Sequence, residues 1–192
     1  MGPEHAAWVS MGGMVRTVYY VAASLDGFIA DAQNSGQWLR DIARARGTDG
    51  SGPDVLNGFG AVAMGAGTYR TFLEMPGSWP YGPLPAWVFT HHEFPGIWEA
   101  DITFVRGDVA EFHPDIVLDA GERDVLLAGG GNLAAQFMAC GLVDEMVLTV
   151  VPAVLGSGHP VLPVRNITAP AALVDERSLG NGAVQLSYDF RR

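Results

Sequence analysis

The chain has 192 residues, 48% of them hydrophobic and 17% charged, which fits one domain with an ample core and makes disorder unexpected. Its formal net charge is −10, and all 11 basic residues other than histidine are arginines. The lack of lysine excludes a Walker-type phosphate loop and Schiff-base or pyridoxal chemistry, and the acidic balance argues against binding to a nucleic-acid backbone.

The N-terminal segment, residues 1–14, lacks the charged start and long apolar run of a signal peptide. It is interpreted as an N-terminal extension or a cloning remnant, and residues 15–192 as a single domain. No run of 18 apolar residues occurs, so no membrane partner is expected. Cys140 is the only cysteine, which excludes an internal disulfide and suits a reducing cytoplasm. Its apolar neighbours in the chain predict a buried structural thiol.

Strands and helices alternate along the chain, which predicts an α/β fold. In chain order, the first half should contain a strand (16–24), a short extended piece (25–31), a helix (38–47), a strand (61–64), a helix (67–75) and a strand (86–90). The second half should contain a strand (101–107), a helix perturbed by Pro114 (108–121), a strand (124–130), a helix (131–141) and a long, broken strand (143–156). Asn181-Gly182 then signals a closing β-hairpin. The sheet should therefore be mixed and mainly parallel, with flanking helices and a C-terminal hairpin.

Three consecutive glycines, Gly129 to Gly131, separate a predicted strand from a predicted helix. The segment fits the G-x-G-x-x-[GA] pattern, but a Rossmann domain would need an acid about 20 residues later and more strands than the rest of the chain can supply. The Rossmann interpretation is therefore rejected. Bare backbone amides at a helix N-terminus still favour a phosphate, and a tight packing turn is the alternative explanation.

Two further segments follow predicted strands and could hold an anion. "MGAGTYRTF" passes through glycines to a helix start, where Thr68 could cap the helix or offer its hydroxyl to a phosphate. Thr90-His91-His92 ends another strand, and no third ligand accompanies the histidine pair, so no metal site is expected. Three such strand ends together indicate one long ligand with several phosphates, such as a dinucleotide.

Five blocks of the sequence occur in the order seen in dihydrofolate-reductase-like proteins: "VAASLDGFIAD", "VAMGAGTY", "WVFTHH", "LLAGGGNLAAQF" and "VDEMVLTVVPAVLGSGHPVLP". They most resemble the reductase domain of the bifunctional riboflavin-biosynthesis deaminase-reductase, as does the closing "SLGNGAVQLSYDF". The resemblance extends from about residue 15 to the C-terminus. The chain has no cysteine pair for a deaminase zinc, so only the reductase half is represented.

The resemblance implies NADPH bound across the strand ends. By motif match, Ala22 and Ile29 would border the nicotinamide. The phosphates would be held by Gly65, Thr68 and Tyr69 from one helix start and by Gly129, Gly130, Gly131, Asn132 and Leu133 from the other. Thr90, His91 and His92 would lie by the adenosine ribose and its 2′-phosphate. Gly131→Val is expected to crowd the amides and weaken NADPH binding.

One position departs from the family pattern. The family often carries a basic residue after Gly65, where this chain has Ala66. His91 and His92 are then the remaining candidates for the 2′-phosphate. Because histidine is only partly charged at neutral pH, the preference for NADPH over NADH is expected to weaken as the pH rises from about 6 to 8.5. Thr90 and backbone amides are the alternative.

The resemblance further implies hydride transfer to a small heterocyclic substrate, pterin-like or ribosylamino-pyrimidine-like, as in dihydrofolate reductase or 5-amino-6-(5-phosphoribosylamino)uracil reductase. Asp26 is the candidate catalytic residue, as proton donor or substrate anchor, and a turn aspartate is the alternative. His159 could face the substrate or simply belong to a loop. A non-catalytic NADP(H)-binding dimer that acts as a sensor is the alternative function. Apolar strands near the end of the chain predict a homodimer.

Overall fold

A computed structural model of the chain describes residues 14–45, 53–74, 77, 79–166, 170–180 and 182–191. The predicted extension at residues 1–14 therefore lies outside the described residues, except for Met14. Asn181, half of the predicted hairpin turn, also lies outside them.

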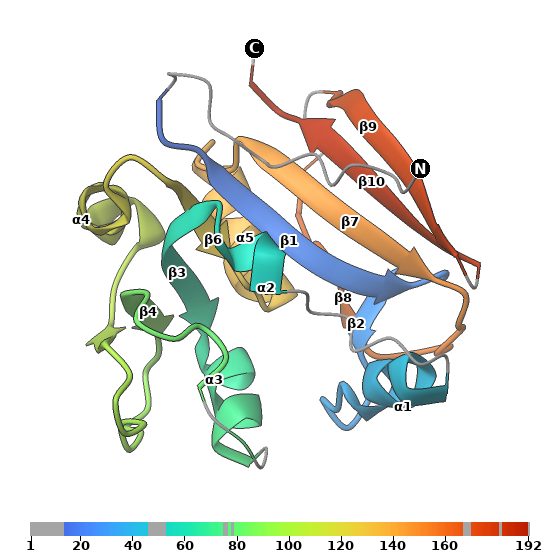
Figure 1. The fold of residues 1–192 in the computed structure, drawn as a ribbon, viewed down its shortest axis with the longest axis horizontal. Coiled ribbons are helices and arrows are strands. Elements are labelled where there is room, and N and C mark those ends of the chain that lie inside the picture. The colour runs from blue at the N-terminus through green and yellow to red at the C-terminus, as the bar shows by residue number, and fades with distance from the viewer. Residues whose placement is uncertain are drawn as a thin grey trace.

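A single mixed sheet of eight strands forms the centre of the fold, in the order β5-β4-β3-β6-β1-β7-β10-β9 (Figure 1). The strands are β1 (Thr17–Ser24), β3 (Phe59–Gly65), β4 (Ala86–Phe89), β5 (Ile102–Val105), β6 (Asp124–Leu127), β7 (Glu145–Val151), β9 (Ala172–Gly180) and β10 (Ala183–Asp189). The six strands from β5 to β7 are parallel, and the hairpin of β10 and β9 joins the sheet antiparallel. This arrangement confirms the predicted fold class.

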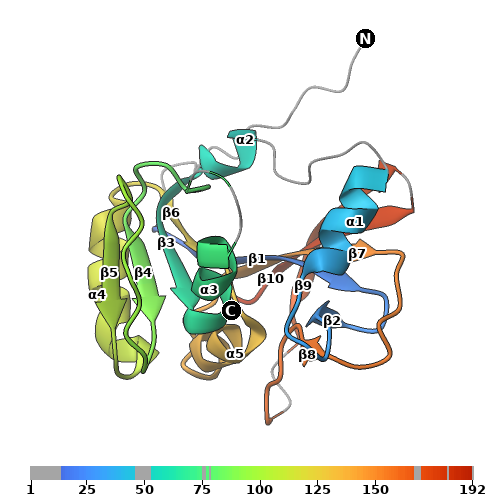
Figure 2. The same ribbon diagram turned by 90° about the horizontal axis from the view of Figure 1, so that it is seen from below.

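Helices cover both faces of the sheet, as Figure 2 shows for α2 on one side and α5 on the other. The helices are α1 (Gln37–Ala45), α2 (Pro53–Leu56), α3 (Ala66–Glu74), α4 (Val109–Ala120) and α5 (Gly131–Ala139). Side chains of α4 and α5 belong to one hydrophobic cluster, and side chains of α2 and α3 to the other. Within the described residues, no helix has the length and apolar character needed to cross a bilayer.

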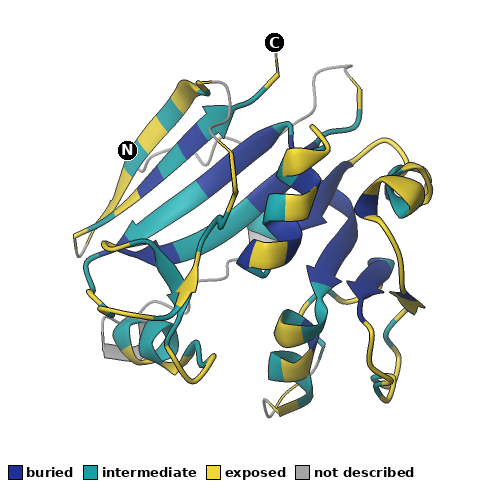
Figure 3. Cartoon of the chain, turned by 180° about the vertical axis from the view of Figure 1, so that it is seen from behind, coloured by how far each residue is buried: buried dark blue, intermediate teal, exposed yellow. Residues whose placement is uncertain are grey.

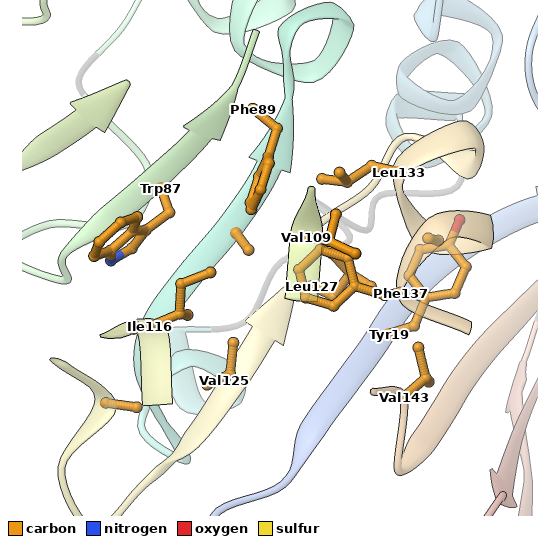
Figure 4. Packing of buried hydrophobic residues seen from close by; sticks show 14 of the residues in the cluster. Tyr19, Trp87, Phe89, Val109, Ile116, Val125, Leu127, Leu133, Phe137 and Val143 are labelled. Atoms are coloured by element: carbon orange, nitrogen blue, oxygen red, sulfur yellow. The ribbon is translucent and has the colours of Figure 1, made fainter. Parts of the chain in front are cut away.

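The larger hydrophobic cluster lies between the sheet and the helices α4 and α5 (Figure 4). Tyr19 of β1, Leu127 of β6 and Phe137 of α5 are fully buried there. All four residues of β4 and of β6 are buried, because parallel strands covered by helices on both faces have no solvent side. Burial of these short strands fixes their positions in the sheet and therefore the edge at which they end.

Four details differ from the sequence-based expectation. The short helix α2 and a second, two-stranded sheet of β2 (Phe28–Ala30) and β8 (His159–Pro160) were not predicted as such. Helix α4 runs unbroken through Pro114, and the Asp108 side chain caps it by accepting a hydrogen bond from the Ala110 N–H. Cys140 is exposed, contrary to the predicted buried thiol: it follows the exposed Ala139 at the end of α5, whereas Met138 and Leu142 pack against the core.

Most of the edge strand β9 is exposed (Figure 3), and large apolar residues stand near both of its ends. Leu173, Val174 and Leu179 have exposed fractions of 49%, 56% and 46%. Because exposed apolar residues on an edge strand need a cover, we expect a homodimer with this strand in the interface. Sedimentation at micromolar concentration should give a dimer, and Leu173→Glu with Val174→Glu should shift it to a monomer. A monomeric wild type would contradict the prediction.

Candidate functional site

The parallel strands β3, β4, β5 and β6 all end at the same edge of the sheet, where α/β proteins place their ligands. A cavity of about 600 Å³ opens at this edge, a size typical of ligand sites. It is lined by the start of α3, the start of α5, the ends of β4 and β5, and the small sheet of β2 and β8. The cavity therefore brings together segments that are far apart in the chain.

Two glycine turns meet beneath this cavity. The Gly65 N–H at the end of β3 donates to the Gly129 carbonyl at 2.8 Å, which ties the start of α3 to the turn before α5. A Cβ placed on Gly130 would lie 3.7 Å from Ile29 Cδ1 and 4.0 Å from Thr68 Oγ1, which are ordinary contact distances. Gly130 therefore faces the cavity between the two helix starts, and its lack of a side chain leaves the amides there uncovered.

Glycine is required at the other two positions of the turn, 129 and 131, for different physical reasons. Gly129 has a φ of +94°, a conformation that L side chains rarely adopt. A Cβ on Gly131 would lie 2.2 Å from the Pro160 carbonyl oxygen and 3.0 Å from that of Val161, so a side chain there would collide with backbone. The packing explanation thus holds for Gly131, while Gly130 is the position that is open to a ligand.

Nine of the predicted cofactor-binding residues line the cavity: Ile29, Gly65, Thr68, Thr90, His91, Gly130, Gly131, Asn132 and Leu133. Ala22, Tyr69, His92 and Gly129 do not. Tyr69 is fully buried, and its hydroxyl donates to the Pro95 carbonyl at 2.7 Å, so its side chain cannot hold a phosphate as expected. The His92 ring packs edge-on against Phe94, with centroids 6.4 Å apart. Of the histidine pair, His91 is therefore the one that borders the cavity.

The ends of β4 and β5 form the part of the cavity predicted to hold the adenosine ribose. The Thr90 hydroxyl is engaged within its own turn, since it accepts from the His92 N–H at 2.9 Å and donates to the His92 carbonyl at 3.0 Å. Arg106, directly after β5, lines the cavity and donates from Nη2 to the His91 carbonyl. Among the described residues no group of three or more His, Cys, Asp or Glu could hold a metal ion.

Sequence reasoning missed Arg106 because it considered each strand end singly. The pairing of Phe89 with Val105 in parallel neighbouring strands sets Thr90 and Arg106 side by side, and only the strand order reveals that pairing. Asn34, Phe72 and Gln136 also line the cavity, although the sequence did not predict them. His159 lines it too, as a residue that faces the substrate would have to.

Asp26 lies outside the cavity lining and holds a loop instead. Its carboxylate accepts from the Ser24 hydroxyl at 2.6 Å and from the N–H groups of Leu155 and Gly156, the latter at 2.7 Å. These hydrogen bonds, that from Ser24 above all, lower the pKa of Asp26 below its ordinary value. A carboxylate that stays ionised is a poor proton donor, so the structure favours the turn-forming alternative over the catalytic one.

The loop that Asp26 holds leads directly into the cavity wall. After Leu155 and Gly156 the chain enters β8, where His159 pairs with Ala30 and the Val161 N–H donates to the Gly27 carbonyl at 2.9 Å. The Tyr19 hydroxyl donates to the Val161 carbonyl at 2.8 Å. The segment is thus fixed at both ends, which positions His159 and Pro160 at the cavity.

Comparison with known proteins identifies relatives of the chain. A sequence model described as the RibD C-terminal domain matches residues 79–184. The uncharacterized protein YwjB of Bacillus subtilis is 32% identical over 174 residues, which cover 90% of this chain and 97% of YwjB.

Two solved structures share the fold. The diaminohydroxyphosphoribosylaminopyrimidine deaminase/5-amino-6-(5-phosphoribosylamino)uracil reductase of Thermotoga maritima superposes with a TM-score of 0.63 at 18% identity, over 92% of this chain and 56% of that one. The dihydrofolate reductase of Enterococcus faecalis, complexed with NADP(H) and RAB-propyl, gives a TM-score of 0.55 at 12% identity, over 91% and 95%. The chain therefore belongs to the RibD C-terminal domain family and has a dihydrofolate-reductase-like fold.

Proposed function

We propose that the chain is an NADPH-dependent reductase that transfers a hydride to a small heterocyclic substrate, pterin-like or ribosylamino-pyrimidine-like. One observation carries the proposal: Gly130 faces the cavity between the starts of α3 and α5. The backbone amides of two helix starts thus converge on one space, which suits the pyrophosphate of a dinucleotide. The cofactor would supply the hydride, and the protein would supply orientation and electrostatics.

Residues that line the cavity can be assigned to the phosphates, the nicotinamide and the substrate. Thr68 and Asn132, at the two helix starts, would contact the phosphates. Ile29 of β2 would border the nicotinamide. Asn34 and His159 line the cavity on the side of β2 and β8, and both can form hydrogen bonds with the carbonyl or ring nitrogens of a flat heterocycle.

The alternative, a non-catalytic NADP(H)-binding sensor, is favoured by one feature. None of the described residues that line the cavity is an aspartate or a glutamate. A reduction needs a proton as well as a hydride, so the proton would have to come from His159, from water or from the substrate's own surroundings. Both functions require cofactor binding, but only the reductase turns over a substrate.

Calorimetric titration with NADPH, followed by NADPH oxidation assays on a panel of dihydropterins, dihydrofolate and ribosylamino-pyrimidines, tests the proposal. Binding together with oxidation by a member of the panel would support the reductase. Binding without oxidation by any member would favour the sensor. If NADPH does not bind, both functions are wrong.

Asp26→Asn is expected to lower turnover by about tenfold or less, because it loosens the loop that carries His159 without removing a proton donor. Loss of a proton donor typically costs about 10²–10⁴-fold. The pH–rate profile should keep its shape in this variant, and Asp115→Asn, at an exposed position of α4 away from the cavity, should leave turnover unchanged. A loss above a hundredfold together with a lost limb of the profile would return Asp26 to the catalytic role.

A further inference from the structure

The strand β9 forms one edge of the sheet, where it pairs with β10 and with no other strand of the described residues (Figure 1). Edge strands present unpaired backbone N–H and C=O groups that can pair with a strand of another chain. β9 has nine residues, whereas β5 at the opposite edge has four. β9 is therefore the edge that offers a second chain the longer ladder.

The side chains of β9 follow a pattern that is symmetric about Glu176. Asp175 and Arg177 stand directly on either side of it. The exposed Leu173 and Leu179 stand three residues away on either side. A strand with this pattern is complementary to an inverted copy of itself, because a twofold axis at the central residue brings the acid opposite the base and leucine opposite leucine.

The two charges that flank Glu176 lie on one face of the sheet. Side chains alternate along a strand, so Asp175 and Arg177 share a face and Glu176 lies on the other. Arg177 Nη2 lies 2.6 Å from Asp175 Oδ2 within the chain, and the two side chains stay 38% and 41% exposed. A second ion pair of the same kind can therefore form alongside the first when another copy approaches the edge.

We propose that two copies of the chain join along β9, antiparallel to each other, about a twofold axis at Glu176. The two sheets then form one continuous sheet. Asp175 of each copy lies opposite the partner's Arg177, and Leu173 lies opposite the partner's Leu179. The one unfavourable contact is Glu176 opposite the partner's Glu176, on the face away from the ion pairs. This assembly does not depend on the proposed function.

Charges on an edge strand usually protect it from unwanted pairing, and on β9 they select one register. A twofold pairing that keeps the faces of both sheets aligned must place its axis at a residue. Moving the axis to Asp175 or to Arg177 sets that residue opposite its own copy and separates the opposite charges. Register shifts in the ladder with β10 leave Val174 and Leu179 out of the regular pairing, so an axis at position 176 falls within the regular part of the strand.

Charge reversal tests this register in a sedimentation dilution series. Asp175→Arg and Arg177→Asp should each raise the dissociation constant of the dimer at least about tenfold, because each sets like charges opposite each other twice per dimer. The double change should return the constant close to the wild-type value, since exchanging the two charges keeps them complementary. Glu176→Gln should lower it about 1.5- to 5-fold by removing the like-charge contact.

Two matched controls change the net charge by the same amounts at a distance from β9. Asp115→Arg on α4 and Arg123→Asp just after it are exposed positions and should leave the dissociation constant unchanged. Thermal unfolding verifies that every variant is folded.

Disulfide trapping tests the position of the axis. Residues directly opposite each other in an antiparallel pair have Cα atoms about 4.5–5.5 Å apart, within the range of a disulfide. In a Cys140→Ser background, which removes the only native cysteine, Glu176→Cys should therefore cross-link two copies on oxidation. Ser178→Cys should cross-link much more slowly, because its two copies would lie four residues apart along the ladder.

The results separate this arrangement from other dimers. Weaker association in both single reversals, recovery in the double change and cross-linking at position 176 would establish it. A monomeric wild type, a dimer indifferent to both reversals, or a faster cross-link at position 178 would overturn it. None of these results bears on cofactor binding, so the proposed function is tested separately.

Discussion

Arg16→Met is expected to lower the free energy of unfolding by about 3–5 kcal/mol, because it leaves two buried carboxylates without their cation. Arg16 Nε donates to Asp124 Oδ2 at 3.0 Å, and its Nη1 donates to Glu145 Oε2 at 2.7 Å. The side chains of Asp124 and Glu145 are only 8% and 6% exposed. The second oxygen of Glu145 is buried without a hydrogen-bond partner among the described residues, so this carboxylate depends on Arg16. Such a loss is a large part of the stability of an ordinary domain.

The pH dependence of that loss identifies its cause. Burial raises the pKa of Glu145, and Arg16 counteracts the rise. Without Arg16 the folded-state pKa should rise further, and a raised carboxyl pKa means stability that is present at low pH and lost as the pH increases. The deficit of Arg16→Met should therefore be smallest near the ordinary glutamate value of 4.5 and grow as the pH rises through the folded-state pKa.

Two variants serve as controls in the same denaturation experiment. Arg191→Met breaks an ion pair with Asp189 in which the arginine side chain is 52% exposed, and it should cost less than about 1 kcal/mol. Glu145→Gln added to Arg16→Met should recover part of the lost stability. Equal losses in Arg16→Met and Arg191→Met, independent of pH, would contradict a buried ion pair.

The second large effect is a loss of NADPH affinity at Gly130, which contrasts with a loss of stability at its neighbour Gly131. Gly130→Ala should fold normally, because its Cβ meets nothing closer than 3.7 Å and its φ of −76° suits any residue. The methyl group would stand in the cavity between Ile29 and Thr68, and NADPH affinity should fall at least about tenfold, or about 1.4 kcal/mol. Gly131→Ala should instead destabilise the fold by about 1–3 kcal/mol or more, because its Cβ would collide with the Pro160 carbonyl.

Thermal unfolding and NADPH titration of both variants distinguish these effects. Gly96→Ala is the matched control, since nothing lies within 4 Å of its Cβ position, and it should change neither quantity. Gly131→Val, the change that the sequence suggested, cannot separate the two, because it would disturb the backbone of β8. A Gly130→Ala variant with full affinity would show that no phosphate approaches this turn.

The sequence was sufficient for the parts of the fold that depend on local pattern. Buried apolar runs such as 86–89 and transitions from glycine to helix are visible in consecutive residues, so the sheet, α3 and α5 could be predicted. Strand β8 has only two residues, one of them proline, and it exists because Asp26, Gly27 and Tyr19 hold its flanks from elsewhere in the chain. No pattern of consecutive residues predicts such a strand.

The site was predictable to the same extent. Gly65, Thr68 and Gly130 to Leu133 lie in continuous motifs, and all of them line the cavity. Arg106 depends on which strand neighbours β4, and Tyr69 and Asp26 depend on partners distant in the chain, Pro95 and Leu155–Gly156. The surroundings of a side chain could not be predicted where its nearest neighbours in space come from another segment.

The contact between Gly131 and Pro160 also bears on how this family evolves. A family member that bound no nucleotide would still need glycine at position 131, since the backbone of β8 leaves no room for a Cβ. Position 130 is under no such packing requirement and would be free to drift. A relative that keeps the glycine corresponding to Gly131 and replaces the one corresponding to Gly130 would therefore retain the fold without binding a ligand at this turn.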